Sequence, residues 1–447
     1  MRVLLTTGIG SRGDVQPLVA LASRLRESGH QARFCVPPDF LDWVEGLGFP
    51  VTPIGPQLRG TGPAQRPSRS TQPSAQPART QAGPGPRPAG PAPQGHATGT
   101  PPQRLGELTE ALVAEQFATI AEAAQGCDVI VATALQVAAR SVAETMDIRY
   151  GFAAFCPAFL PSPHHPPPPL AALSRGEPLS AADHQELWDR HAGRFNEVFG
   201  VALNRFRASV GLGAVEDVRP HVFTERPWLA ADPVLAPWPG LAEAVWQMGP
   251  WVLPDERPLD PELEAFLAAG EPPVYFGFGS MRMPAGLAEV IMAAVRRGGR
   301  RAVIAAGWAG LTPPGPDGGC LGIGEVNQQA LFGRVAAVVH HGGAGTTTAA
   351  ALAGVPQVVI PQAYDQPYWA QRVTELGIGA TCPPGTPDTS SLAEALDQVL
   401  QPSVAARAQA LRPTLTTTGT QTAATNLAGT ASRATTASPA PAASRRR

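Results

Sequence analysis

The sequence contains no lysine. All 34 basic residues are arginines, and with 36 acidic residues they give the 447-residue chain a net charge of −2. The absence of lysine excludes P-loop nucleotide hydrolases and pyridoxal enzymes, because the first need a lysine on the phosphates and the second need a lysine Schiff base. The balanced charge gives no indication of nucleic acid or an anionic membrane as a partner.

Long apolar runs and paired cysteines are also missing. No stretch approaches the roughly 18–20 apolar residues of a membrane-spanning helix, and the start of the chain becomes polar too soon for a signal peptide. The five cysteines are scattered and never form a CxxC pair, which argues against a disulfide framework and a zinc site. We therefore expect a cytoplasmic protein with reduced thiols and no integral membrane contact.

One internal segment lacks both acids and large apolar residues. Between Arg59 and Arg104 the chain contains no Val, Ile, Leu, Met, Phe, Trp, Tyr, Asp or Glu. Such a composition cannot bury enough apolar surface to offset the entropy lost on ordering. Residues 57–104 are therefore predicted to be a disordered insertion, and residues 416–447, rich in Thr, Ala and Ser, a partly disordered tail.

The rest of the chain alternates between strand-like and helix-like segments. Residues 3–6 form a short apolar run, and residues 18–25 carry apolar side chains at helical spacing. A second series begins at Pro273. Further strand candidates are residues 33–36, 128–132, 274–278, 301–305, 321–326, 336–340 and 357–360. This alternation predicts an α/β protein whose parallel sheets are covered by helices on both faces.

The length predicts two domains, at roughly 100–200 residues per domain. We place the first at residues 1–235 and the second at residues 259–415. Residues 236–258, rich in Trp and Pro, are expected to form the linker between them.

A glycine-rich turn follows the first strand. Gly8, Gly10 and Gly13 match the GxGxxG pattern of dinucleotide-binding turns. A nicotinamide enzyme would also need an acid after the next strand, where Asp39 is the only candidate and follows two prolines. Three interpretations stay open: a cofactor-binding turn, a plain tight turn, and an active-site turn of another kind, which we favour.

A second loop is suited to an anion. The strand at residues 336–340 runs into His340-His341-Gly-Gly-Ala-Gly-Thr-Thr-Thr348, where a helix begins. Small residues let the backbone approach a ligand, and the free N–H groups and positive dipole end of the helix face the loop. With its two histidines and three threonines the loop predicts a phosphate site, although a glycine turn capping a buried helix would look similar.

Asp365 and Gln366 follow the next strand along the chain. A carboxylate beside a carboxamide can bind a polyol through paired hydrogen bonds. The same pair alone would also suit a helix N-cap. Its place beside the phosphate loop favours a sugar site.

Together these motifs resemble those of the family-1 glycosyltransferases of bacterial natural-product pathways, above all the glycopeptide-antibiotic (vancomycin-type) group. The resemblance rests on Gly279-Ser280, His341-Gly-Gly-Ala-Gly-Thr346, Asp365-Gln366 and Gly10-Ser-Arg-Gly-Asp-Val-Gln-Pro17. It extends over most of residues 1–400 and implies the GT-B fold, in which two Rossmann-like doubly wound domains face each other across a cleft. Sterol glucosyltransferases share the start of this pattern, so the acceptor class does not follow from it.

The resemblance implies a role for each motif residue. Asp14 takes the place of the general base, on the cleft turn that also carries Ser11 and Arg12. The implied donor-site residues are Ser280, His341, Gly343, Gly345 and Thr346 for the phosphates, Asp365 and Gln366 for the sugar, and the region of Val326 and Gln329 for the nucleobase.

These roles imply an inverting, metal-independent transfer. Asp14 would take the proton from an acceptor hydroxyl as it attacks the sugar. The helix start at Thr346, with His341 and Thr347, would stabilise the leaving nucleotide diphosphate. The donor would be a UDP- or dTDP-sugar on the second domain, and the acceptor a lipophilic or aromatic antibiotic aglycone on the first. The nucleotide sugar is a co-substrate, so no cofactor is expected.

Other functions explain less of the sequence. A sterol-type lipid glucosyltransferase would share the motifs, as would a catalytically silent helper, but a helper has no need of Asp14, His341 and Asp365 together. A nicotinamide oxidoreductase would rest on the glycine turn and leave the second half unexplained. An epimerase or a phosphorylase of the same fold stays open, the latter weakened by the missing lysine.

Overall fold

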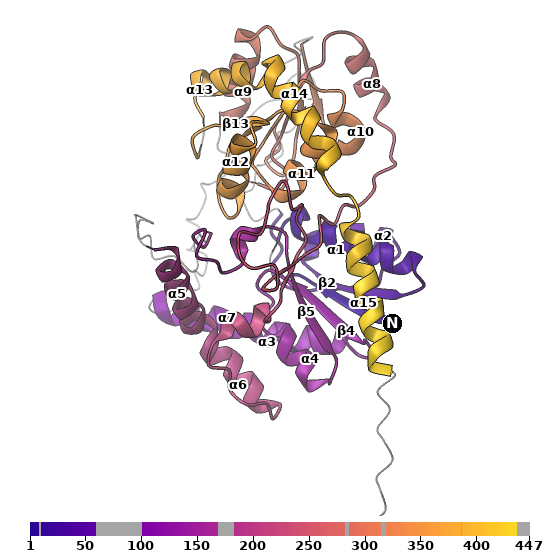
Figure 1. Ribbon diagram of the computed structural model, residues 1–447, viewed down its shortest axis with the longest axis vertical. Helices are drawn as coiled ribbons and strands as arrows, with labels where there is room; N and C mark the ends of the chain where they lie inside the picture. Colours follow the sequence, from indigo (N-terminus) through magenta and orange to yellow (C-terminus); the bar gives the residue numbers. More distant parts are fainter. Residues whose placement is uncertain are drawn as a thin grey trace, which may run out of the picture.

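The chain folds into two lobes joined by extended segments (Figure 1). The computed structural model describes residues 1–8, 10–59, 101–168, 183–281, 286–313, 319–385 and 387–435. Most of the predicted insertion, residues 60–100, and the end of the predicted tail, residues 436–447, lie outside the described residues. Within the described part of the chain, no helix has the length and apolar character needed to cross a membrane.

The first lobe is built on a parallel sheet with the strand order β3-β2-β1-β4-β5-β6-β7. Its strands are β1 (Arg2–Thr6), β2 (Gln31–Val36), β3 (Val51–Pro53), β4 (Val129–Thr133), β5 (Arg149–Ala154), β6 (Trp228–Leu229) and β7 (Trp246–Gln247). Its helices are α1 (Arg12–Glu27), α2 (Leu41–Gly46), α3 (Pro101–Ala123), α4 (Ala139–Thr145), α5 (His184–Phe195), α6 (Val201–Ser209) and α7 (Val218–Phe223).

The second lobe repeats the design with the strand order β10-β9-β8-β11-β12-β13. Its strands are β8 (Val274–Gly277), β9 (Ala302–Ala305), β10 (Cys320–Ile323), β11 (Ala337–His340), β12 (Gln357–Val359) and β13 (Gly379–Thr381). Its helices are α8 (Pro261–Ala268), α9 (Leu287–Arg297), α10 (Gln328–Phe332), α11 (Ala344–Ala353), α12 (Gln366–Glu375), α13 (Thr389–Val399) and α14 (Pro402–Leu411). Both sheets are doubly wound, as the family resemblance implies.

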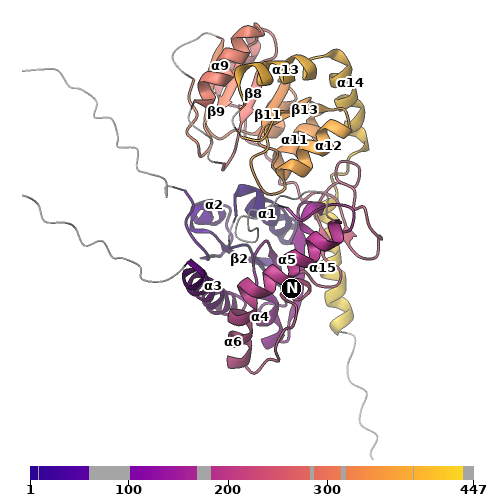
Figure 2. The ribbon, with the colours of Figure 1, turned by 90° about the vertical axis from the view of Figure 1, so that its left-hand side faces the viewer.

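The last helix, α15 (Gly419–Thr435), returns to the first lobe and lies along α1 (Figures 1 and 2). Ala423, Ala424 and Leu427 are buried there in the same apolar cluster as Val15 and Leu18 of α1. Small side chains let the two helices approach closely. The first half of the predicted tail is therefore a packed helix that ties the two ends of the chain together.

Two predicted boundaries are corrected by the structure. Residues 101–104, placed in the insertion, are the first turn of α3, a position in which the two prolines at residues 101 and 102 are well tolerated. Residues 246–247, placed in the linker, form β7 and belong to the first sheet. A two-residue edge strand is too short to leave a periodic signal in the sequence.

The order of the strands determines where a site can form. In the first sheet the direction of winding reverses between β1 and β4, and in the second it reverses between β8 and β11. Ligands of open α/β sheets bind beyond the carboxyl ends of the strands at such reversals. The predicted motifs follow β1 in the first lobe and β8 and β11 in the second, so both reversal points carry them.

Candidate active site

A cavity of about 1860 Å³ lies between the two lobes. Residues from both lobes line it, including the turns after β1, β8 and β11. All the predicted site residues except Thr347 lie along its wall: Ser11, Arg12, Asp14, Ser280, Val326, Gln329, His341, Gly343, Gly345, Thr346, Asp365 and Gln366. The fold thus brings together residues that are up to 355 positions apart in the chain, as from Ser11 to Gln366.

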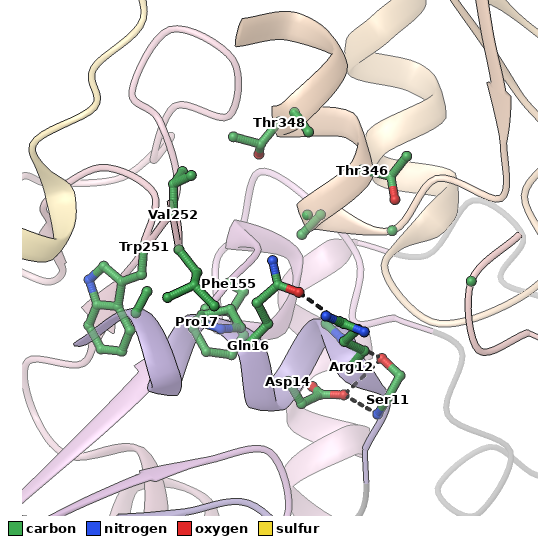
Figure 3. Close-up of a pocket in the computed structure, with 18 of the residues that line it drawn as sticks. Ser11, Arg12, Asp14, Gln16, Pro17, Phe155, Trp251, Val252, Thr346 and Thr348 are labelled. Atoms are coloured by element: carbon green, nitrogen blue, oxygen red, sulfur yellow. Dashed lines mark hydrogen bonds between the residues drawn. The ribbon is translucent and has the colours of Figure 1, made fainter. Parts of the chain in front are cut away.

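The lower wall of the cavity is the start of α1 (Figure 3). Ser11 is the N-cap of this helix and accepts a hydrogen bond from the Gly13 N–H at 3.1 Å. Asp14 is the third helical residue, and its Oδ2 accepts the Ser11 N–H at 2.7 Å, which completes a capping box. A Cβ on Gly10 would lie 2.5 Å from Asp14 Oδ2, so the glycine lets the turn close around this carboxylate.

The surroundings of Asp14 shift the pKa of its carboxyl toward neutral pH. Withdrawal from water raises the pKa of its carboxyl from 3.8 to about 6, against the lowering effect of the hydrogen bonds from Ser11. A general base works best with a pKa near the working pH. Ser11, not Asp14, occupies the N-cap position of α1. Asp14 nevertheless helps to cap the helix through the Ser11 backbone.

The two adjacent histidines after β11 have different roles. His340 is fully buried, its Nδ1 accepts the Gly342 N–H at 3.1 Å, and its Nε2 therefore donates to Gln357 Oε1 at 2.9 Å. It holds the loop in shape and does not line the cavity. His341 does line it, and its buried Nδ1 has no hydrogen-bond partner among the described residues. Burial lowers the pKa of His341 from 6.5 to about 4, so the ring is neutral at pH 7.

The start of α11 forms the wall opposite Asp14. Figure 3 shows Thr346 and Thr348 above α1, on the side of the cavity that faces it. Helix geometry leaves the first backbone N–H groups of α11 without intrahelical partners. The prediction for Thr347 is wrong: this residue is fully buried, and its hydroxyl donates to the Gly343 carbonyl at 2.9 Å. Thr348, one position on, reaches the cavity instead.

Asp365 stands at the N-cap position of α12 without capping it. Its Oδ2 accepts the indole N–H of Trp369 at 2.8 Å, which leaves the other oxygen for a ligand. Burial, with a smaller contribution from the charge of Asp14, raises the pKa of this carboxyl from 3.8 to about 6. Two carboxyls from opposite lobes therefore interact across the cavity.

Gln366 is more constrained than the sequence suggests. It is 3% exposed, and its Oε1 accepts the N–H groups of Gln362 at 2.7 Å and Ala363 at 3.1 Å. Its Nε2 points to the sulfur of Met281 at 3.4 Å. The amide oxygen thus shapes the turn before α12, and the amide N–H₂ is the group left to reach a sugar hydroxyl.

The chain is similar to known proteins over nearly its whole length. Residues 4–81 match the glycosyltransferase family 28 N-terminal domain, and residues 319–424 match the erythromycin biosynthesis protein CIII-like C-terminal domain. Glycosyltransferase GtfE of Amycolatopsis orientalis is 46% identical over 95% of this chain and 96% of its own length. The chain belongs to the family-1 glycosyltransferases. Vancomycin aglycone glucosyltransferase of the same organism is 45% identical, covering 97% of this chain and 98% of that protein.

Solved glycosyltransferase structures share the fold. The kitacinnamycin glycosyltransferase gives a TM-score of 0.64 over 96% of this chain and 98% of its own, at 18% identity. The calicheamicin glycosyltransferase CalG4 gives 0.61 over 97% of this chain and 99% of its own, also at 18% identity. The predicted GT-B fold and the predicted glycosyltransferase family are confirmed. The glycosyltransferase is a hexose-transferring enzyme.

In this glycosyltransferase the predicted nucleobase region is tied to the linker. Gln329 Nε2 donates to the Leu253 carbonyl at 2.7 Å, and its Oε1 lies 3.4 Å from the Asp255 N–H. Both polar atoms of Gln329 are therefore engaged with the linker, while Val326, partly buried, presents an apolar surface to the cavity. The role of both residues toward a nucleobase stays a prediction.

Contacts across the cleft were not predicted from the sequence. Arg12 forms an ion pair with Glu325 of the other lobe at 2.7 Å, and its backbone N–H lies 3.5 Å from Ser280 Oγ. Phe40 and Trp308 stack across the same cleft with ring centroids 6.0 Å apart. These partners are more than 260 residues apart, so no local pattern in the sequence could pair them.

The first lobe contributes an aromatic wall to the cavity, and this wall was not predicted from the sequence either. Three phenylalanine rings line the cavity and contact one another. The ring centroids are 4.6 Å apart for Phe152 and Phe223, and 6.2 Å apart for Phe223 and Phe195. His191, 9% exposed, lies 5.1 Å from Phe195, and neither of its ring nitrogens has a partner among the described residues. It shares a helical face with Trp188 and Phe195, a pattern typical of a core residue. Asp39 also lines the cavity, and its carboxylate accepts the N–H groups of Leu58 and Arg59, which anchors a loop there.

Proposed function

We propose that this glycosyltransferase moves a hexose or deoxyhexose, with inversion, from a UDP- or dTDP-sugar to a hydroxyl of an aromatic antibiotic aglycone of the vancomycin type. The observation that carries the proposal is the pairing of Asp14 on one lobe with the α11 N-terminus on the other across one cavity. A base and an anion site on facing walls suit the attack of a hydroxyl on one side of a sugar and the departure of a diphosphate on the other.

The donor would lie on the second lobe. The free N–H groups at residues 344–346, together with His341 and Ser280, offer hydrogen bonds to the diphosphate, and the helix dipole favours negative charge there. Asp365 and the Gln366 amide would hold sugar hydroxyls. A known relative, dTDP-epi-vancosaminyltransferase, is 42% identical over 91% of this chain. The spinosyn rhamnosyltransferase SpnG, of the same fold, is known in complex with thymidine diphosphate.

The acceptor would lie on the first lobe against the aromatic wall, with its hydroxyl toward Asp14. As the hydroxyl oxygen attacks the anomeric carbon, Asp14 takes the hydroxyl proton. The bond to the diphosphate breaks on the opposite face, and the α11 N-terminus stabilises the charge that develops on it. Two relatives are named for an antibiotic aglycone and for a dTDP-activated sugar, and neither name favours a sterol acceptor or a silent helper.

The direct test is a transfer assay with purified full-length protein. Vancomycin aglycone is incubated with UDP-glucose or with dTDP-glucose, and the products are read by mass spectrometry. We expect the aglycone to gain one hexose with at least one of the two donors. Absence of both transfer and donor hydrolysis, in a protein that does not bind UDP or dTDP by calorimetry, would contradict the proposal.

A further inference from the structure

The turn that leads into α12 holds a tyrosine where glycine is normally required. The Gln366 N–H donates to the Ala363 carbonyl at 3.2 Å, which closes a turn with Tyr364 and Asp365 at its two central positions. Tyr364 has φ +59° and Asp365 has φ −82°. A positive φ followed by a negative one is the pattern of a type II′ turn, whose first central position is dominated by glycine. A side chain there strains the backbone.

The strained conformation is held by the residues around it. Gln366 Oε1 accepts the N–H groups of Gln362 and Ala363, so the turn is tied from inside by a buried amide. The tyrosine itself contributes little to this structure. Its side chain is 50% exposed, and no hydrogen bond or ring contact joins it to another described residue. Packing in the folded protein therefore does not explain why a tyrosine stands here.

The position of Tyr364 in the cavity suggests a reason for a tyrosine in this turn. It lines the cavity directly before Asp365, whose carboxyl is withdrawn from water, so the tyrosine stands further out on the same wall. A donor held by the α11 N-terminus lies deep in the cleft, whereas an acceptor entering from solvent passes the half-exposed ring. Phe152, Phe155 and Phe159 line the cavity from the other lobe. An acceptor in this space would have aromatic surface on both sides.

We propose that Tyr364 is an acceptor-binding residue whose ring packs on an apolar, aromatic face of the aglycone while the neighbouring Asp365 holds the donor sugar. The inference rests on the proposed function, since it requires an acceptor in this cavity. Aromatic packing of this kind favours flat, uncharged ring systems, and it predicts a preference for acceptors that present an aromatic face over equally reactive aliphatic alcohols.

The test compares Tyr364→Gly and Tyr364→Phe with the wild type. The measurements are the KM for vancomycin aglycone at saturating donor, the affinity for UDP or dTDP by calorimetry, and the Tm. Tyr364→Gly should raise the aglycone KM by about three- to tenfold, the range expected for one aromatic contact, and leave nucleotide affinity within about twofold, since the ring lies outside the nucleotide site. Its Tm should equal or exceed that of the wild type, because glycine adopts φ +59° without strain. Tyr364→Phe should behave as the wild type.

Leu241→Ala provides a matched control, because it removes an apolar side chain that is 77% exposed and outside the cavity lining. It should leave the aglycone KM unchanged. A wild-type KM in Tyr364→Gly, a parallel loss of nucleotide affinity, or a lowered Tm would overturn the assignment of Tyr364. Failure of the wild type itself to transfer sugar to the aglycone would instead show that the proposed function is wrong, and the inference would fall with it.

Discussion

At the scale of single residues, burial shifts the pKa values of three side chains that line the cavity. Burial moves the pKa of Asp14 and of Asp365 up to about 6 and that of His341 down to about 4. At neutral pH the cavity therefore holds two interacting carboxylates and a neutral imidazole. The partial positive charge at the N-terminus of α11 would stabilise a negatively charged donor in this cavity.

Replacing Asp14 with asparagine separates the catalytic role from the capping role. Asparagine can still accept the Ser11 N–H with its side-chain oxygen, but it cannot take a proton. We expect kcat to fall by about 10²–10⁴-fold with nucleotide affinity unchanged, measured by initial rates and calorimetry. In the wild type, kcat should rise as pH increases through about 6, because the base is active only when ionised.

The same variant has a stability signature. The folded-state pKa of Asp14 lies above its ordinary value of 3.8, so the folded protein binds this proton more tightly and loses stability as pH rises from 4 through 6. Asp14→Asn removes that cost, and its Tm at pH 7 should equal or exceed the wild-type Tm. Asp14→Ala, which loses the capping acceptor as well, is the control and should melt lower than Asp14→Asn. Full transfer activity in Asp14→Asn would rule this residue out as the base.

His341 is expected to act on the donor. His341 lines the cavity with a neutral ring, so its ring N–H can donate to a phosphate oxygen of the donor. His341→Ala should weaken UDP or dTDP binding by about 1–3 kcal/mol, the cost of one hydrogen bond to a charged group. Calorimetry measures this directly. His340→Ala is not a usable control, because that ring supports the Gly342 backbone; an unchanged affinity in His341→Ala would place the diphosphate elsewhere.

At the scale of elements, the proposed chemistry would depend mainly on the starts of three helices. The N-terminus of α1 would position the proposed base Asp14, that of α11 would face the donor diphosphate, and that of α12 carries Asp365 at the cavity. A helix N-terminus supplies fixed N–H donors and partial positive charge without a metal ion. The three starts lie at the carboxyl ends of β1, β11 and the segment after β12, so the parallel sheets aim them at the same cavity.

Removal of divalent metal tests this account of α11. If the helix N-terminus stabilises the leaving diphosphate, transfer in excess EDTA should proceed at about the rate measured with added Mg²⁺, within roughly twofold, because no metal takes part in the charge stabilisation. The comparison is made on protein dialysed against EDTA, with re-addition of Mg²⁺ as the control. A loss of transfer in EDTA that Mg²⁺ restores would mean that a metal ion takes part in stabilising the charge of the leaving diphosphate.

The elements were predictable where sequence patterns are local. Buried runs such as residues 3–6 and 357–360 became β1 and β12, and the helix after Gly343 begins as the small residues suggest. The phase of that helix was not predictable: whether Thr347 or Thr348 faces the cavity depends on how α11 packs. Likewise no prediction was made for His191, which shares a helical face with Trp188 and Phe195, and only the fold shows that this residue borders the cavity.

At the scale of the whole molecule, the site exists only because two lobes face each other. The Arg12–Glu325 ion pair and the Phe40–Trp308 stack connect the lobes at the cavity, and α15 returns from the second lobe to the first. None of these contacts is local in the chain. The sequence could indicate two α/β domains and their motifs, but the pairing of their walls had to come from the structure or from the family resemblance.

The central claim is that the sugar is transferred by a single displacement in the cavity between the two lobes. The configuration of the product tests this claim most directly. Wild-type protein is given UDP-α-glucose or dTDP-α-glucose and vancomycin aglycone, and the anomeric proton of the first-formed glycoside is examined by NMR. With Asp14 on one face of the sugar and the diphosphate leaving from the other, the account predicts a β-glycoside. An α-glycoside would contradict it, because retention requires a different order of bond making and breaking in this cavity.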